Sequence, residues 1–179
     1  KIRADEFSIF TKRLINEVDM LSPLRGGYRD SNIAFDVAGS GASHAPSVKS
    51  VGITGQLTGS RASEVIADDI EVISNSLTND MRAKLLHRCG EFESVLLPGG
   101  KIKYLGTPQN YETIYNKLAE RDYKLRIWTA RMPSEDKIVD YHGCLAPMIM
   151  ESNKEEGEPI DPMRFDNDDL NDRESNMGR

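Results

Sequence analysis

Apolar residues follow two kinds of spacing along this chain, and the two kinds alternate. Steps of three and four residues predict an amphipathic helix over 3–21, with Phe7, Phe10, Leu14, Val18 and Leu21 on its apolar face. The same periodicity predicts helices over 79–97 and 110–121. Short apolar runs predict strands at 33–37, 48–53, 65–67, from Ile102 onward and at 125–129. Strands that alternate with helices of this length indicate an α/β fold, a parallel sheet with flanking helices.

One predicted strand ends in carboxylates. Asp68 and Asp69 directly follow the apolar run 65–67, and Glu71 comes two residues later. Ligands of parallel α/β sheets bind outside the carboxyl ends of the strands. A Walker B segment has this pattern, in which one carboxylate holds Mg²⁺ beside nucleotide phosphates and the next orients the attacking water. A surface strand that runs into an acidic turn has the same pattern, so these residues alone leave both interpretations open.

A second strand end is also polar. The strand that starts at Ile102 runs into Gly106, Thr107, Pro108 and Gln109. In a parallel sheet this turn and the acid pair open on the same rim, so the Thr107 hydroxyl and the Gln109 amide are expected near a bound phosphate. An ordinary strand-terminating turn remains the alternative for these residues.

Composition places the chain in the globular class, with 38% hydrophobic and 29% charged residues. No apolar run reaches the length of about 18 residues that a spanning helix needs, and the first residues contain no apolar signal core. The two cysteines form no C-x-x-C pair, and the three histidines lie too far apart along the chain to indicate a zinc site. Trp128, in the middle of a predicted strand, is expected in the core.

The net charge of −6 is concentrated at one end. Residues 151–179 hold ten acids and four bases, together with Gly157, Pro159 and Pro162, so the remainder of the chain is neutral. This composition predicts a loosely held, largely non-regular linker beyond a domain boundary near residue 150. Lysines and arginines between 101 and 126 can contribute a surface that faces DNA, but because this part of the chain is neutral overall, an ordinary solvated face is the preferred interpretation.

A phosphate-binding loop of the form G-x-x-x-x-G-K-[ST] is expected before a Walker B strand, and this sequence has none. Neither Gly39-Ser40-Gly41 nor Gly99-Gly100-Lys101 continues with the required residues. Because the chain also begins at lysine, we expect it to be a fragment whose first strand and P-loop lie upstream.

Several long motifs carry a family resemblance. They are RDS at 29–31, FDV at 35–37, HAPSVKSVGITGQLTGSRA at 44–62, VIADDIE at 65–71, SNS at 74–76, YLGTPQ at 104–109 and DPMRFD at 161–166. Together they closely resemble the large terminase subunit (DNA maturase B) of short-tailed bacteriophages, over nearly the whole chain. The resemblance implies an incomplete P-loop NTPase-type (terminase/RecA-like) sheet, with 1–150 the C-terminal part of the ATPase domain. Residues 151–179 would be an acidic linker toward a nuclease domain.

The function implied by the resemblance is that of an ATP-driven motor. Such motors package viral double-stranded DNA into the procapsid, and a nuclease domain of the intact protein cuts concatemeric DNA. The expected partners are DNA, the portal protein, the small terminase subunit and further copies in a ring, at the procapsid portal vertex in the host cytoplasm and without a membrane. Mg²⁺ with ATP is the expected cofactor, and the fragment alone is expected to be an inactive part of an ATPase.

Individual roles also follow from the resemblance. Asp68 matches the Mg²⁺ ligand, and Asp69 matches the catalytic carboxylate, a position that is usually glutamate in related motors. Glu71 is the alternative base. Thr107 and Gln109 match the segment that couples hydrolysis to movement.

Arg61 stands just before the acid strand, where a guanidinium can reach a phosphate or a neighbouring subunit. A surface ion pair with Glu64 or another acid explains it equally well.

Two other functions share part of this pattern. A superfamily-2-like helicase or translocase also has an acid strand and a later threonine-bearing strand, but its basic and aromatic tracts for single strands are not evident here. A non-catalytic assembly module that binds portal or small terminase needs no nucleotide site at all.

Overall fold

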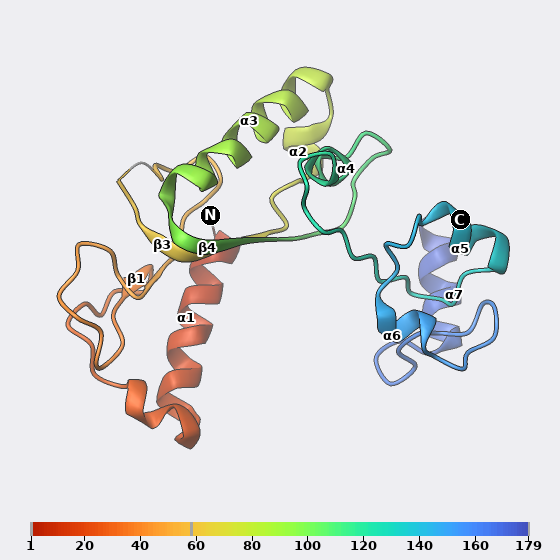
Figure 1. Cartoon of the computed structure of the whole chain (residues 1–179). Helices are drawn as coiled ribbons and strands as arrows, with labels where there is room; N and C mark the ends of the chain where they lie inside the picture. Colours follow the sequence, from red (N-terminus) through yellow and green to blue (C-terminus); the bar gives the residue numbers. More distant parts are fainter. Residues whose placement is uncertain (1, 58, 179) are drawn as a thin grey trace. The chain divides into compact units, whose positions relative to one another are not determined.

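The chain divides into two compact units, Lys1–Leu118 and Ala119–Arg179 (Figure 1). The structure, a computed structural model, describes residues 2–57 and 59–178. The division between the units lies well before residue 150, so the boundary suggested by composition falls inside the second unit.

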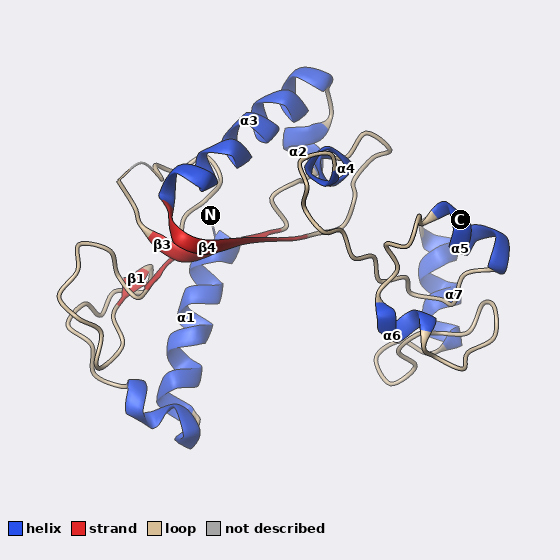
Figure 2. Ribbon diagram, in the orientation of Figure 1, coloured by secondary structure: helices blue, strands red, loops and turns tan. Residues whose placement is uncertain are grey.

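The first unit is built on a parallel pair of strands. β3 (Ala62–Asp68) pairs with β4 (Leu96–Leu105), with Glu64 opposite Lys101 and Asp68 opposite Leu105. The crossover between them carries α2 (Ile73–Ser76) and α3 (Asn79–Val95), as a parallel connection requires. Figure 2 shows the two strands running side by side beneath α3. The predicted parallel sheet with flanking helices is thereby confirmed for these elements.

Helix α3 packs on β4 through its apolar face. Leu85, Cys89, Phe92 and Val95 are buried along that face, at the helical spacing that the sequence predicts. The Phe92 and Tyr104 rings lie 5.9 Å apart between centroids, which joins the helix to the strand. The Thr78 hydroxyl accepts a hydrogen bond from the Met81 backbone N–H and so fixes where the helix begins.

The two strands predicted at 33–37 and 48–53 are shorter and run in the opposite sense. β1 (Ala34–Phe35) pairs antiparallel with β2 (Val48–Lys49) in a separate sheet. No helix lies between them among the described residues, and antiparallel pairing is the arrangement that such a helix-free connection permits. The prediction that these segments belong to the parallel sheet is therefore wrong.

The first helix exists but buries a different face from the one predicted. α1 spans Ile2–Glu17 and is followed by a 3₁₀ helix, η1, at Asp19–Leu24. Phe7 and Phe10 are more than half exposed, whereas Ser8 and Ile15 are buried. The buried face is anchored by polar contacts, since the Ser50 hydroxyl donates to Asp5 Oδ1 at 2.9 Å and Lys12 pairs with Asp30. The face of α1 that is buried is therefore set by contacts with later segments of the chain, and the spacing of apolar residues within the helix contains no information about these contacts.

The second unit has a small core of its own. Leu145, Ala146 and Ile149 are buried at its centre, and Ile127, Met132, Ile138, Tyr141 and Ile160 pack around them. Its helices are α5 (Glu135–Asp140), α6 (Pro147–Met150) and α7 (Asn167–Asn176), while α4 (Ile114–Ala119) lies at the division between the units.

The predicted strand at 125–129 is reduced to one bridge, between Ile127 and Leu145. Ile127 packs on the core, and Trp128, the next residue, is 62% exposed. Neighbouring side chains of an extended segment point to opposite sides, so only one of the two can face the core. The prediction that Trp128 is a core residue is wrong.

The acidic segment after residue 150 is partly ordered. Helix α7 begins at an Asp166 cap, whose side chain accepts from Asp169 N at 2.9 Å, and it buries Leu170. Arg131 holds this helix to the rest of the unit: its guanidinium donates to Glu174, Asn171 and Asn167. Outside α7 the segment is largely non-regular, as predicted, whereas α7 itself packs on the second unit. Among the described residues, no helix is long and apolar enough to cross a membrane.

Candidate functional site

The acid pair lies at the carboxyl end of the parallel strand, as predicted. Asp68 is the last residue of β3 and pairs with Leu105, the last residue of β4. The Asp69 N–H donates to the Leu105 carbonyl at 3.0 Å, so Asp69 continues the pairing by one residue. Both carboxylate side chains are exposed. Solvent and ligands can therefore reach them.

The chain changes direction at Asp69. Its φ is 45°, in the left-handed region that few residues other than glycine adopt and that aspartate tolerates better than most. Such conformations cluster at functional sites. This turn leaves Asp69 at the rim and leads the chain inward to Glu71.

The Thr107–Gln109 turn lies beside the acid pair, because it follows Leu105 within two residues. Gln109 Nε2 donates to the Thr107 carbonyl at 3.1 Å and so closes the turn on itself. Both side chains are exposed. A Cβ at Gly106 would overlap the Tyr115 ring, so only glycine fits at the start of this turn. The prediction that the two polar strand ends share one rim is confirmed.

Glu71 is placed quite differently from the aspartates. It is 1% exposed. Its Oε2 accepts from the Ile114 N–H at 2.7 Å and from the Thr113 hydroxyl at 3.0 Å. Its Oε1 accepts from the Gln109 N–H at 3.1 Å. The carboxylate thus joins the end of the acid segment to the loop that follows β4 and to the first residue of α4.

Two residues of this network escaped the sequence analysis, Thr113 and Tyr115. The sequence signal for them is Glu71 itself, a carboxylate between the apolar residues Ile70 and Val72. A charged group in such a run needs buried donors. Sequence does not reveal that the donors come from some forty residues further along the chain.

Tyr115 packs against the same turn. Its hydroxyl donates to the Leu105 carbonyl at 3.4 Å. Burial of the phenol, together with the nearby charges of Glu71 and Asp69, raises the pKa of Tyr115 from 10.0 to about 12. The phenol stays protonated and keeps its hydrogen bond at neutral pH.

The raised pKa predicts a loss of stability in alkali. Between pH 10.0 and about 12 the unfolded chain releases the Tyr115 proton while the folded chain retains it, so the free energy of unfolding falls as the pH rises. Below pH 10.0 this contribution is constant. Urea unfolding across that window should show a steeper decline for the parent than for Tyr115→Phe. Equal slopes for the two proteins would contradict the prediction.

Arg61 is not brought to the acid pair. It precedes β3, whereas the aspartates end it, and a strand of seven residues separates the two by about 20 Å. The Arg61 guanidinium donates to the Ser60 carbonyl at 2.7 Å. Glu64, the acid considered as its partner, pairs with Lys103. A phosphate held at Asp68 is therefore beyond the reach of Arg61 in the same chain.

The ligands at the rim suit Mg²⁺. Among residues 2–57 and 59–178, no group of three or more His, Cys, Asp or Glu side chains is clustered for a metal. Mg²⁺ does not need such a cage, because it commonly binds one or two carboxylates and completes its shell with water and phosphate oxygens. Asp68 and Asp69 offer hard oxygen ligands on an accessible rim, so they fit this ion.

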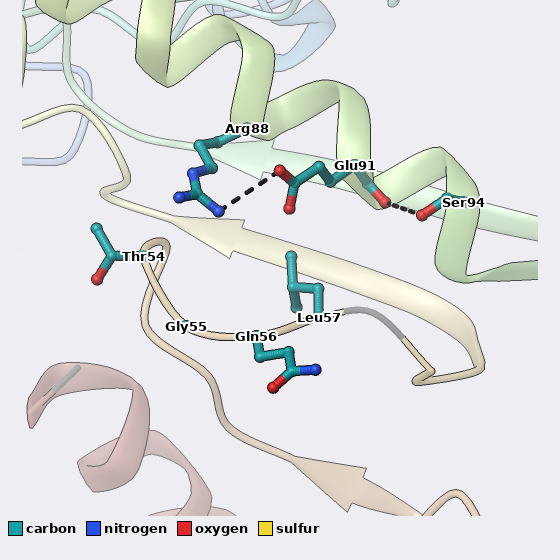
Figure 3. A pocket seen from close by; sticks show the side chains of 7 residues that line it. All are labelled: Thr54, Gly55, Gln56, Leu57, Arg88, Glu91 and Ser94. Atoms are coloured by element: carbon teal, nitrogen blue, oxygen red, sulfur yellow. Dashed lines mark hydrogen bonds and ion pairs between the residues drawn. The ribbon is translucent and has the colours of Figure 1, made fainter.

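A hollow of about 370 Å³ lies elsewhere in the first unit (Figure 3). Gly55, Gln56 and Leu57 form one wall, and Arg88 and Glu91 of α3, an ion pair at 3.5 Å, form the other. None of the predicted site residues lines it. The candidate site is therefore the open rim at the strand ends and not this hollow.

By its fold and site, the first unit is an α/β unit with accessible carboxylates at the carboxyl end of a parallel strand. Comparison with known proteins then adds the family. The chain is 46% identical to the terminase large subunit of Enterobacteria phage T3, over 190 aligned positions that cover all of this chain and 32% of that protein. No family model matches the chain. The chain thus corresponds to a segment of a large terminase subunit, as its motifs predicted, and spans about a third of that relative's length.

Proposed function

We propose that this chain is part of an ATP-driven motor that packages viral double-stranded DNA, with Asp68 and Asp69 at its Mg²⁺·ATP site. The placement of the acid pair beside the Thr107–Gln109 turn, at the paired ends of β3 and β4, carries this proposal. The identity to a terminase large subunit supports the role in DNA packaging. The phosphate-binding loop would come from residues outside this chain.

Each group at the rim has a distinct task in this proposal. Asp68 would hold Mg²⁺, which would supply positive charge to stabilise the charge that develops during phosphoryl transfer. Asp69, one residue further and exposed, orients the attacking water. Glu71 is a poor candidate for that task, because its carboxylate is buried and already accepts three hydrogen bonds. Thr107 and Gln109 respond to the phosphate and pass the change to the following loop.

The intact protein would also carry a nuclease and act in a ring at the procapsid portal, with portal protein and small terminase as partners. In such a ring, Arg61 at the far end of β3 is available to an adjoining subunit. The host cytoplasm, where procapsids are filled, is the proposed site of action.

The proposal is tested by comparing the full-length protein with residues 1–179. The full-length protein should hydrolyse ATP only with Mg²⁺ and package DNA into procapsids. The chain of 1–179 should show no appreciable turnover, since its sequence lacks the P-loop lysine and glycines. Robust Mg²⁺-dependent turnover by 1–179 would mean that the phosphate site has been misplaced. Packaging that survives loss of both aspartates would instead favour a non-catalytic assembly module.

A further inference from the structure

Glu71 is the one carboxylate of the acid segment that faces inward. Asp68 and Asp69 are exposed at the rim, and two residues later Glu71 is 1% exposed. A buried charge is costly unless donors satisfy it. Here three donors do so, and all three come from one stretch, Gln109–Ile114.

Those donors fix both ends of the loop after β4. The Gln109 N–H belongs to the end of the Thr107 turn, whereas the Thr113 hydroxyl and the Ile114 N–H belong to the start of α4. Ile114 is itself 1% exposed, so its position is set by packing as well. A shift of Glu71 must therefore displace the turn, the start of α4, or both.

The same loop has a second set of anchors that do not involve the acid segment. Asn110 Nδ2 donates to the Ser76 carbonyl at 3.4 Å, and Glu112 pairs with Arg82 of α3. The Glu112 side chain is 69% exposed, so this ion pair is expected to contribute little. Glu71 thus ties this loop to the acid segment through buried charge-assisted hydrogen bonds, and the Tyr115 hydroxyl of α4 adds a hydrogen bond to the Leu105 carbonyl at the rim.

From this geometry we propose that Glu71 is a positioning residue that transmits the nucleotide state from Asp68 and Asp69 to the loop 107–113 and α4. It is not the catalytic base. The inference rests on the proposed function, because it needs a nucleotide at the acid pair. Only one residue, Ile70, separates Asp69 from Glu71, so a backbone adjustment at the metal site moves the buried carboxylate directly.

The first measurement is amide hydrogen exchange in the full-length protein, with and without a non-hydrolysable ATP analogue and Mg²⁺. In the parent, the nucleotide should change the exchange rates of the Gln109 and Ile114 amides by about tenfold, a usual size for coupling between sites. Glu71→Gln offers a single acceptor oxygen and places an N–H₂ group against the other donors. In this variant the nucleotide effect should fall below about twofold.

The second measurement is the number of base pairs packaged per ATP hydrolysed. This ratio does not depend on the fraction of protein that is active, because an inactive fraction lowers both quantities equally. Glu71→Gln and Thr113→Val should lower the ratio, the former by about tenfold. Thr113→Ser, which keeps the hydroxyl, should restore it. Glu112→Gln is the matched control: it releases the same loop from α3 and should behave as the parent does.

The outcomes separate this inference from the proposed function. If the parent neither binds the Mg²⁺·nucleotide nor hydrolyses ATP, the proposed function fails, and the inference fails with it. If the parent does both and Glu71→Gln retains the nucleotide effect and the packaging ratio, the inference alone is wrong. If Glu71→Gln loses ATP turnover as completely as Asp69→Asn does, Glu71 is the base and the inference is likewise wrong. An equal effect of Glu112→Gln would reduce Glu71 to a general loop anchor and would also overturn it.

Discussion

Asp69→Asn should slow ATP hydrolysis by the full-length protein by about 10²–10⁴-fold, the usual contribution of a positioned acid or base. The amide keeps the size of the side chain but removes the charge that orients the attacking water. Binding of Mg²⁺·ATP should stay nearly intact, because Asp68, the proposed Mg²⁺ ligand, is unchanged. The measurement is kcat together with nucleotide affinity, in protein checked for parent-like folding.

Asp68→Asn is the matched comparison. It removes the charge of the proposed metal ligand, so hydrolysis should be abolished and ATP affinity should weaken only in its Mg²⁺-dependent part. The two variants should thus differ in Mg²⁺-dependent ATP binding, although both should lose most or all of their activity. If Asp69→Asn turns over ATP like the parent, the assignment of Asp69 is wrong. If both variants retain full turnover, the strand-end acids are not a nucleotide site.

Arg131→Ala should destabilise α7 by about 2–3 kcal/mol. The Arg131 side chain is 20% exposed, and its Nε donates to Glu174 Oε1 at 2.7 Å. Its remaining N–H groups donate to the Gly157 carbonyl, Asn167 and Asn171 at 2.8–2.9 Å. Removing this side chain leaves a partly buried carboxylate and two amides without their donor.

Hydrogen exchange of the Asn167–Asn176 amides measures this effect in the 179-residue chain, and rates should rise by roughly 30- to 150-fold. Arg131→Lys should recover only part of the protection of the α7 amides from exchange. A lysine ammonium cannot donate all four of the hydrogen bonds that the planar guanidinium makes. Arg126→Ala is the control, since Arg126 is exposed and its Nη1 donates to the adjacent Leu125 carbonyl. Unchanged exchange in Arg131→Ala would show that Leu170 and the Arg173–Phe165 contact suffice to hold the helix.

Local sequence patterns predicted the structure correctly where it depends on residues within one element or on the order of neighbouring elements. The α3 face of Leu85, Cys89 and Phe92 follows from helical spacing, and the parallel pairing of β3 and β4 follows from a strand–helix–strand order. The place of Asp68 and Asp69 at a strand end needs only the break from apolar to acidic residues. The motifs also indicated the large terminase subunit, and the comparison then found a relative of that name along the whole chain.

Sequence patterns gave wrong predictions where contacts with a segment distant in the sequence determine which side of an element is buried. α1 has an apolar stripe, but polar partners at Asp30 and Ser50 draw its other face inward. Trp128 has the composition of a core residue, yet the bridge of Ile127 to Leu145 leaves it on the outer side. Residues 151–179 have the composition of a linker, and Arg131 binds their helix into a packed unit.

The sequence by itself determined the parallel α/β unit, the acid rim and the terminase relationship, because these depend on short-range periodicity and on contiguous motifs. Only the tertiary structure decided which of the acids face solvent and which is buried. The sequence does not distinguish the three closely spaced carboxylates. In the structure, the left-handed turn at Asp69 leaves Asp68 and Asp69 exposed and places Glu71 in the interior. The donors that meet Glu71 there lie about forty residues away along the chain, and folding alone brings them to it.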